Sequence, residues 1–100
     1  NFVTDLSISG IPVLIDVNSR SKDLNNKIVM IESADPGYDW IFTNNIKGLI
    51  TKYGGAASHM TIRCSEFNIP AAIGCGNKFD SLVNSNEVII DCNNQIIKKL

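Results

Sequence analysis

The chemistry in this sequence centres on His59, the single histidine among 100 residues. Gly54 and Gly55 lie five and four residues before it, and Ser58 stands directly before it. The two glycines permit positive φ angles and close backbone approach. Serine is a preferred N-cap residue, so the pattern predicts a helix that starts beside His59. His59 would then lie where a glycine turn leads into a helix N-terminus.

Such a junction suits an anion, because the first turn of a helix directs backbone N–H groups and partial positive charge past its N-terminus. An imidazole with a free ring nitrogen is a nucleophile. These features predict that His59 attacks phosphorus and then holds a phosphoryl group beside the helix amides. Arg63, four residues later, is expected on the same side of the helix, where its guanidinium can pair with a phosphoryl oxygen.

Each of these residues also has a structural interpretation. A single histidine is more often structural than catalytic, and a Gly-Gly turn before a helix is a weak motif by itself. Arg63 fits a solvated helix position as well as a ligand. Cys75, between Gly74 and Gly76, fits a buried spectator thiol as well as a reactive one. With one histidine and three scattered cysteines, we expect no zinc site.

Apolar runs on the N-terminal side of the junction predict the strands that position it. Residues 28–31 and 48–51 are short apolar segments, which is typical of strands buried on both faces. We expect them to be the central strands of a sheet. The helix after His59 should end at Asn68, since Asn tolerates the left-handed conformation and Pro70 cannot continue a helix.

The remaining segments complete a compact α/β domain. Further strands are expected at residues 2–8, 11–15, 71–73, 87–91 and 95–97, with short helical turns at 39–42 and 79–83. Ser9-Gly10 and residues 34–37 have the composition of turns. The last two strands should form a hairpin and, together with the first strands, a second and more exposed sheet.

Composition limits the class of protein. One hundred residues make one domain with a modest core, and the formal net charge of −1 argues against nucleic acid as the main partner. The sequence has no signal peptide and no apolar run that would span a bilayer, so no membrane partner is expected. Scattered cysteines fit a reducing, cytoplasmic compartment. Because the chain opens at Asn1 without Met, we expect it to be an excised part of a longer protein.

The spacing around His59 resembles the phosphohistidine, or mobile, domain of phosphoenolpyruvate-utilising enzymes. The resemblance rests on paired glycines, a Ser-His pair and an Ile-Pro-Ala segment: Gly54-Gly55-x-x-Ser58-His59, then Ile62, Glu66 and Ile69-Pro70-Ala71. That family includes phosphoenolpyruvate synthase, pyruvate phosphate dikinase and enzyme I of the sugar phosphotransferase system. The similarity extends from about residue 28 to the C-terminus. Within the family, the chain looks most like the synthase-related, ATP-dependent kinases.

The resemblance implies a swivelling β/β/α domain that carries a phosphoryl group on a histidine between two remote sites. His59 matches the phosphorylated histidine. The residues expected to support the phosphoryl group are Gly54, Gly55, Ser58, Thr61 and Arg63. The resemblance also implies that residues 1–100 are the C-terminal part of a larger multidomain enzyme. ATP and Mg²⁺ are expected on partner domains of the same polypeptide, with no metal or cofactor within this chain. The acceptor would be a small molecule such as pyruvate or, in a related kinase, glutamine.

One departure from the family pattern keeps other functions open. The family has Thr before its Asp-Pro pair, where this chain has Ala34, so any contact from that hydroxyl to the histidine is lost. Thr51 or Thr61 is available to replace it. A second hypothesis is therefore a docking or regulatory module with the same fold and no phosphoryl transfer. A third is a structural α/β domain in which His59 only caps a helix.

Overall fold

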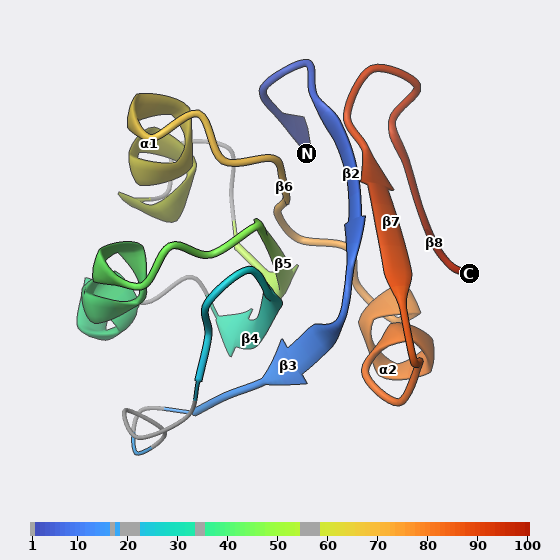
Figure 1. The fold of residues 1–100 in the computed structure, drawn as a ribbon, viewed down its shortest axis with the longest axis horizontal. Helices are drawn as coiled ribbons and strands as arrows, with labels where there is room; N and C mark the ends of the chain where they lie inside the picture. The colour runs from blue at the N-terminus through green and yellow to red at the C-terminus, as the bar shows by residue number, and fades with distance from the viewer. Residues whose placement is uncertain (1, 17, 19–22, 34–35, 55–58) are drawn as a thin grey trace.

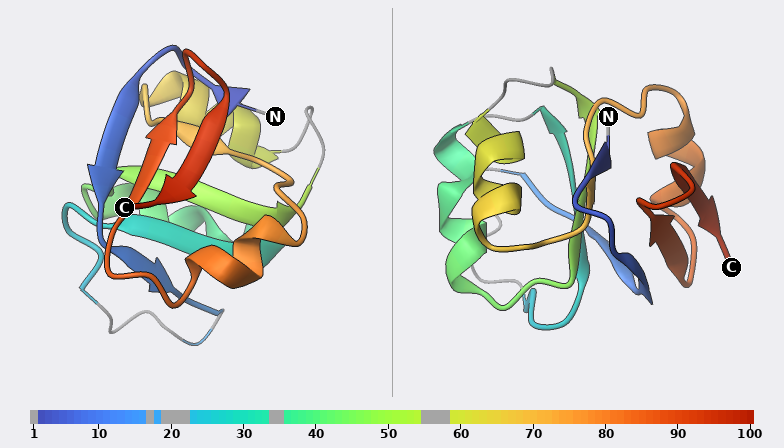
Figure 2. Two further views of the ribbon diagram at one scale, coloured as in Figure 1. Left: turned by 90° about the vertical axis from the view of Figure 1, so that its right-hand side faces the viewer. Right: turned by 90° about the horizontal axis from the view of Figure 1, so that it is seen from above.

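The computed structural model describes residues 2–16, 18, 23–33, 36–54 and 59–100. These residues form three layers, which are seen edge-on in the right-hand view of Figure 2. A five-stranded sheet lies in the middle, helices cover one of its faces, and a three-stranded sheet covers the other (Figure 1). This is the β/β/α arrangement expected from the sequence.

The large sheet contains both apolar runs as its central strands. Its members are β1 (Phe2–Val3), β3 (Pro12–Leu14), β4 (Ile28–Ser33), β5 (Gly48–Tyr53) and β6 (Ala71–Ala72). Their order is β1-β6-β5-β4-β3; β3 to β6 run parallel, and β1 pairs antiparallel with β6. The first four residues of both β4 and β5 are buried, as expected for strands covered on both faces.

Two helical crossovers connect the parallel strands on one face. η1 (Pro36–Thr43), a 3-10 helix, links β4 to β5, and α1 (His59–Glu66) links β5 to β6. Right-handed crossovers that advance in one direction across a sheet place their helices on the same face. The two segments therefore lie side by side over a core that includes Ile41 and Met60 (Figure 1). No helix in the described ranges is long and apolar enough to cross a membrane.

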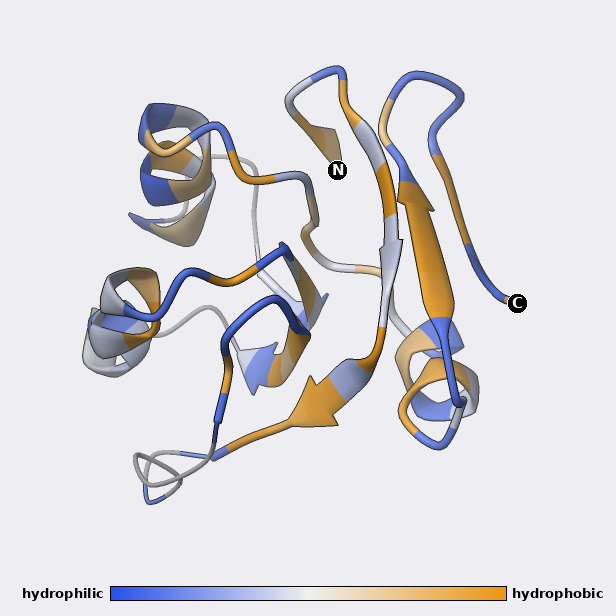
Figure 3. Cartoon of the chain, viewed as in Figure 1, coloured by the Kyte–Doolittle hydropathy of each residue, from blue (hydrophilic) through white to orange (hydrophobic). Residues whose placement is uncertain are grey.

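The small sheet and a second α-helix cover the opposite face. β2 (Ser7–Gly10), β7 (Val88–Asp91) and β8 (Ile96–Lys99) are antiparallel, and α2 is Lys78–Leu82. Figure 3 shows an apolar β7 between polar connecting segments. The predicted C-terminal hairpin is confirmed as β7 and β8. Between the sheets lies a second apolar core that includes Met30, Ile50 and Ile90.

The N-terminal segment differs from the prediction. Residues 2–8 hold two strands in different sheets rather than one strand, and Thr4, with a φ of 75°, lies between them. Ser9-Gly10 was expected to be a turn but belongs to β2. A Cβ on Gly10 would lie only 3.3 Å from Cγ1 of Ile28, so this glycine serves close packing rather than chain reversal. Only β2 of the first strands joins the hairpin.

Candidate functional site

The site lies at the edge of the large sheet where the parallel strands end. β4 ends at Ser33 and β5 at Tyr53, and these two residues are register partners. Because the connections that leave neighbouring parallel strands start at one edge, η1 and α1 both begin there. Gly54 follows β5 with a φ of 135°, and His59 is the first residue of α1. The predicted placement of His59 at a helix start is confirmed.

Part of the predicted junction lies outside the described residues. This applies to Gly55 and Ser58, and to Ala34 in the expected turn before η1. The roles assigned to them remain predictions. Thr61 lies in the first turn of α1 and is half-buried, and its supporting role also remains a prediction.

α1 presents one face to the core and the neighbouring face to the site. Met60 and Cys64, four residues apart, are fully buried in the core and anchor the helix. His59 and Arg63 repeat the same spacing one residue earlier, so their side chains emerge beside each other. The sequence prediction that Arg63 shares a side of the helix with His59 is confirmed, since both side chains contact Asp39 of η1.

The helix end confirms the predicted stop at Asn68. Asn68 has a φ of 55°, and its N–H donates to the carbonyl of Ser65 at 3.2 Å. The N–H of Ile69 donates to the carbonyl of Cys64 at 2.9 Å. This pair of bonds is the Schellman arrangement, which satisfies carbonyls at a helix C-terminus.

η1 packs beside α1, and its period of three residues per turn determines which of its side chains face α1. Tyr38 and Ile41 are buried, at 8% and 0% exposure, and fix one side of the 3-10 helix to the core. In a helix with three residues per turn, Asp39 and Phe42 also lie one above the other, on the next side. Contacts of Asp39 with His59 and of Phe42 with Arg63 place that side against α1.

Asp39 connects the histidine to the arginine through a single carboxylate oxygen. Oδ1 lies 3.0 Å from Nε2 of His59 and 3.1 Å from Nε of Arg63. The hydrogen bond from His59, together with the positive charge of Arg63, holds the pKa of Asp39 below its usual value, although desolvation opposes this. Asp39 therefore remains a carboxylate at neutral and mildly acidic pH. The His59 side chain is 42% exposed, so solvent reaches the ring.

Two aromatic rings and a glutamate hold Arg63 in addition to Asp39. Its guanidinium carbon lies 5.6 Å from the centre of the Phe42 ring and 4.9 Å from that of Phe67. The two rings stack at a centroid distance of 5.6 Å. Nη1 of Arg63 lies 3.6 Å from Oε1 of Glu66. A planar guanidinium over aromatic rings keeps its charge while losing freedom of movement, so the cation is held next to His59.

Thr51 positions the backbone behind the glycine turn. Its side chain is fully buried, and its hydroxyl oxygen accepts a hydrogen bond of 2.9 Å from the N–H of Gly74. The N–H groups of Cys75 and Gly76 donate to the carbonyls of Thr51 and Lys52. The segment after β6 therefore lies along the end of β5. The hydroxyl considered from sequence as a contact to the histidine instead binds this segment.

We expect alanine to be far less tolerated at Gly74 than at Gly76. Both glycines have positive φ angles, which costs an alanine about 1 kcal/mol. A Cβ on Gly74 would in addition lie 2.7 Å from the carbonyl oxygen of Gly54, whereas a Cβ on Gly76 meets no atom within 4 Å. Gly74→Ala should therefore lower the free energy of unfolding by about 2–4 kcal/mol and Gly76→Ala by about 1 kcal/mol in urea denaturation. Equal losses would contradict close packing against Gly54.

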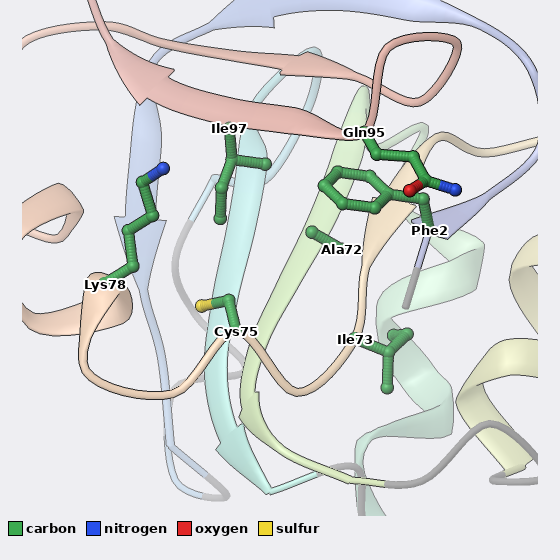
Figure 4. A pocket seen from close by; sticks show the side chains of 7 residues that line it. All are labelled: Phe2, Ala72, Ile73, Cys75, Lys78, Gln95 and Ile97. Carbon is green, nitrogen blue, oxygen red and sulfur yellow. The ribbon is translucent and has the colours of Figure 1, made fainter.

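A cavity of about 210 Å³ lies elsewhere, mainly against the core between the two sheets. Figure 4 shows its lining: Phe2, Ala72, Ile73, Cys75, Lys78, Gln95 and Ile97. It is smaller than the usual range for small-molecule sites, about 300–1,000 Å³. Burial raises the pKa of the Cys75 thiol, which keeps it protonated. Of the two sequence interpretations of Cys75, the spectator thiol is favoured.

Asp39 is the acidic residue of this cluster that was not predicted from the sequence. It was expected in a helical turn at 39–42, with no partner assigned. The available signal was the spacing of Tyr38 and Ile41 against Asp39 and Phe42, which suits a 3-10 helix with one buried side. Within the described ranges, no three His, Cys, Asp or Glu side chains gather as a metal site would require.

Comparison with known families agrees with this architecture. The model for the mobile domain of PEP-utilising enzymes matches residues 23–95, a span that includes Asp39, His59 and Arg63. The chain belongs to this mobile-domain family, as the resemblance around His59 suggested.

Individual relatives are much longer proteins. The chain is 31% identical over 65 residues to a phosphoenolpyruvate synthase of Neisseria meningitidis, covering 65% of this chain and 8% of that protein. It is 26% identical over 91 residues to a phosphoenolpyruvate-protein phosphotransferase of Borreliella burgdorferi, covering 89% and 16%. It is 32% identical over 62 residues to a rifampicin phosphotransferase of Bacillus subtilis, covering 61% and 7%. The chain thus spans less than a fifth of each relative.

Proposed function

We propose that this chain is a phosphohistidine carrier domain of an ATP-dependent phosphotransferase, with His59 as the residue that is phosphorylated. His59 would receive a phosphoryl group at a nucleotide site and deliver it to a small acceptor at another site. The covalent intermediate divides one transfer into two steps, and attachment to the same polypeptide keeps the carrier at a high effective concentration near both sites.

The observation that carries this proposal is the position of the His59 ring. The ring is solvent-exposed at the first residue of α1, within the span matched by the family model. It lies beside the guanidinium of Arg63, which contacts the same Asp39 oxygen. A helix start and a guanidinium both favour the negative charge that a phosphoryl group would bring. Both features come from one helix, so they move together with the histidine.

We further propose that the rest of the machinery lies in other domains of the same protein. ATP and Mg²⁺ would be bound there, and so would the acceptor, since each relative is several times longer than this chain. The names of the relatives include phosphotransferases for a protein and for an antibiotic as well as a synthase. Pyruvate and glutamine remain candidate acceptors, and the acceptor site would decide between them.

Incubation of the intact enzyme with ATP and Mg²⁺ tests this proposal. We expect a phosphate group on the peptide that contains His59, stable to alkali and lost in acid, as a phosphorus–nitrogen bond should be. Mass spectrometry under neutral conditions would locate it, and addition of the acceptor should remove it. Stable phosphate elsewhere, or no label while the enzyme turns over, would refute the carrier role and favour a docking module.

A further inference from the structure

Asp39 lies where a group bound to Nε2 of His59 would lie. Its Oδ1 is 3.0 Å from Nε2 and 3.1 Å from Nε of Arg63. A carboxylate oxygen only accepts hydrogen bonds, so in this arrangement Nε2 carries the ring proton. A protonated Nε2 has no free lone pair and cannot attack phosphorus. In this structure Nε2 of His59 therefore donates to Asp39 and has no lone pair available for attack on phosphorus.

A phosphoryl group on Nε2 would compete with Asp39 for the space beside Nε2 and for the guanidinium of Arg63. It would bring negatively charged oxygens next to a carboxylate, and two like charges at this distance repel each other. It would also need the cation that Asp39 now binds. The guanidinium of Arg63 binds carboxylate and phosphoryl oxygens with the same fork of donors, so it can exchange one anion for the other.

The contacts of both residues suit such an exchange. Arg63 remains next to Phe42, Phe67 and Glu66 without help from Asp39. The Asp39 side chain is 44% exposed, so it can turn into solvent without crossing the core. The cation would therefore stay in place while the anion beside it changes.

We propose that Asp39 is a positioning residue that holds the empty His59 in its Nε2-protonated form and is displaced from Nε2 and Arg63 when the phosphoryl group arrives. The inference rests on the proposed function. Before the transfer from ATP, Nε2 gives its proton to water and Nδ1 takes one up, which leaves a lone pair on Nε2. A P–O bond of ATP then breaks, the departing nucleotide oxygen keeps the electron pair, the Nε2–P bond forms, and the Nδ1 proton is released to water. Asp39 is thus displaced as loading begins, and until then its hydrogen bond to Nε2 protects the unphosphorylated carrier from reaction away from the nucleotide site.

Phosphoramidate provides a test that needs neither ATP nor partner domains. Its P–N bond breaks as Nε2 of the Nδ1-protonated ring forms the Nε2–P bond, and the ring proton leaves with ammonia as ammonium. The 100-residue chain would be compared with Asp39→Asn and with Asp80→Asn. The latter is a matched control, because Asp80 also pairs with a cation, Lys52 at 3.0 Å, but lies on α2 across the large sheet.

We expect phosphoramidate to label His59 about threefold to tenfold faster in Asp39→Asn, since one charge-assisted hydrogen bond no longer holds Nε2. Asp80→Asn should match the wild type. Nitrogen NMR of the histidine ring should show protonated Nε2 in the wild-type chain and a shift toward protonated Nδ1 in Asp39→Asn. An unchanged or slower labelling rate, or protonated Nδ1 in the wild type, would overturn the inference.

A measurement on the wild-type chain covers the case in which Asp39→Asn does not fold. The NMR signals of the Asp39 carboxyl carbon and of the Arg63 Nε–H should both change on phosphorylation, and the carboxyl carbon should move to the shift of a solvated aspartate. Persistence of the Asp39–Arg63 contact in the loaded chain would overturn the inference. Failure of the carrier function itself would appear separately, as absence of ATP-dependent label in the intact enzyme.

Discussion

Replacing His59 with glutamine is expected to abolish phosphoryl loading and to lower turnover of the intact enzyme by at least about a thousandfold, because the nucleophile is removed. Glutamine is similar in length, and its amide can donate a hydrogen bond to Asp39 as Nε2 does at 3.0 Å. His59 is exposed, so the fold should be preserved. Acid-labile phosphate after incubation with ATP, and turnover with the acceptor, are the two measurements.

The control for this variant is binding of ATP, which we assign to another domain. His59→Gln should bind ATP with the affinity of the wild type and should melt at the same temperature. His59 is the single histidine of this chain, so any acid-labile phosphate that persists in its peptides would have to be on another residue type. Such a label, or turnover within tenfold of the wild type, would contradict the carrier role of His59.

The elements predicted best from sequence are those whose burial leaves a direct mark on composition. A strand buried on both faces must be apolar at successive positions, and β4 and β5 have this pattern. The end of α1 could be predicted equally well, because Asn is one of the few residue types that adopt the left-handed conformation found at Asn68. Gly10 was wrongly predicted to lie in a turn, because its residue type has more than one structural meaning. Glycine marks both turns and close packing, and only the position of Ile28 shows which applies.

The site was predictable only where it depends on spacing along one helix. His59 and Arg63 are four residues apart, so α-helical geometry alone places them together. Asp39 is twenty residues before His59, and its approach depends on how η1 packs beside α1. That packing follows from two crossovers on one face of the sheet, which is a property of topology rather than of local sequence.

Replacing Arg63 should have the second-largest effect, and two variants separate its charge from its shape. Arg63→Met keeps an unbranched side chain next to Phe42 and Phe67 but removes the cation and its donors. We expect its ATP-dependent loading rate to fall about a hundredfold, which is typical for loss of a donor to a developing anion. Arg63→Lys keeps the charge but loses the planar fork, and a fall of about tenfold is expected. Rapid-quench measurement of label on His59 gives both rates.

The competing explanation is that Arg63 only joins η1 to α1. In that case both variants would lower the melting temperature, while the loading rate per folded molecule would stay at the wild-type value. Lys52→Met is the matched control, because it removes a cation from another carboxylate pair, with Asp80, on the other side of the large sheet. Its loading rate should equal that of the wild type. A loading rate that falls in Arg63→Met but not in Lys52→Met, at equal folded fraction, assigns the effect to the charge beside His59.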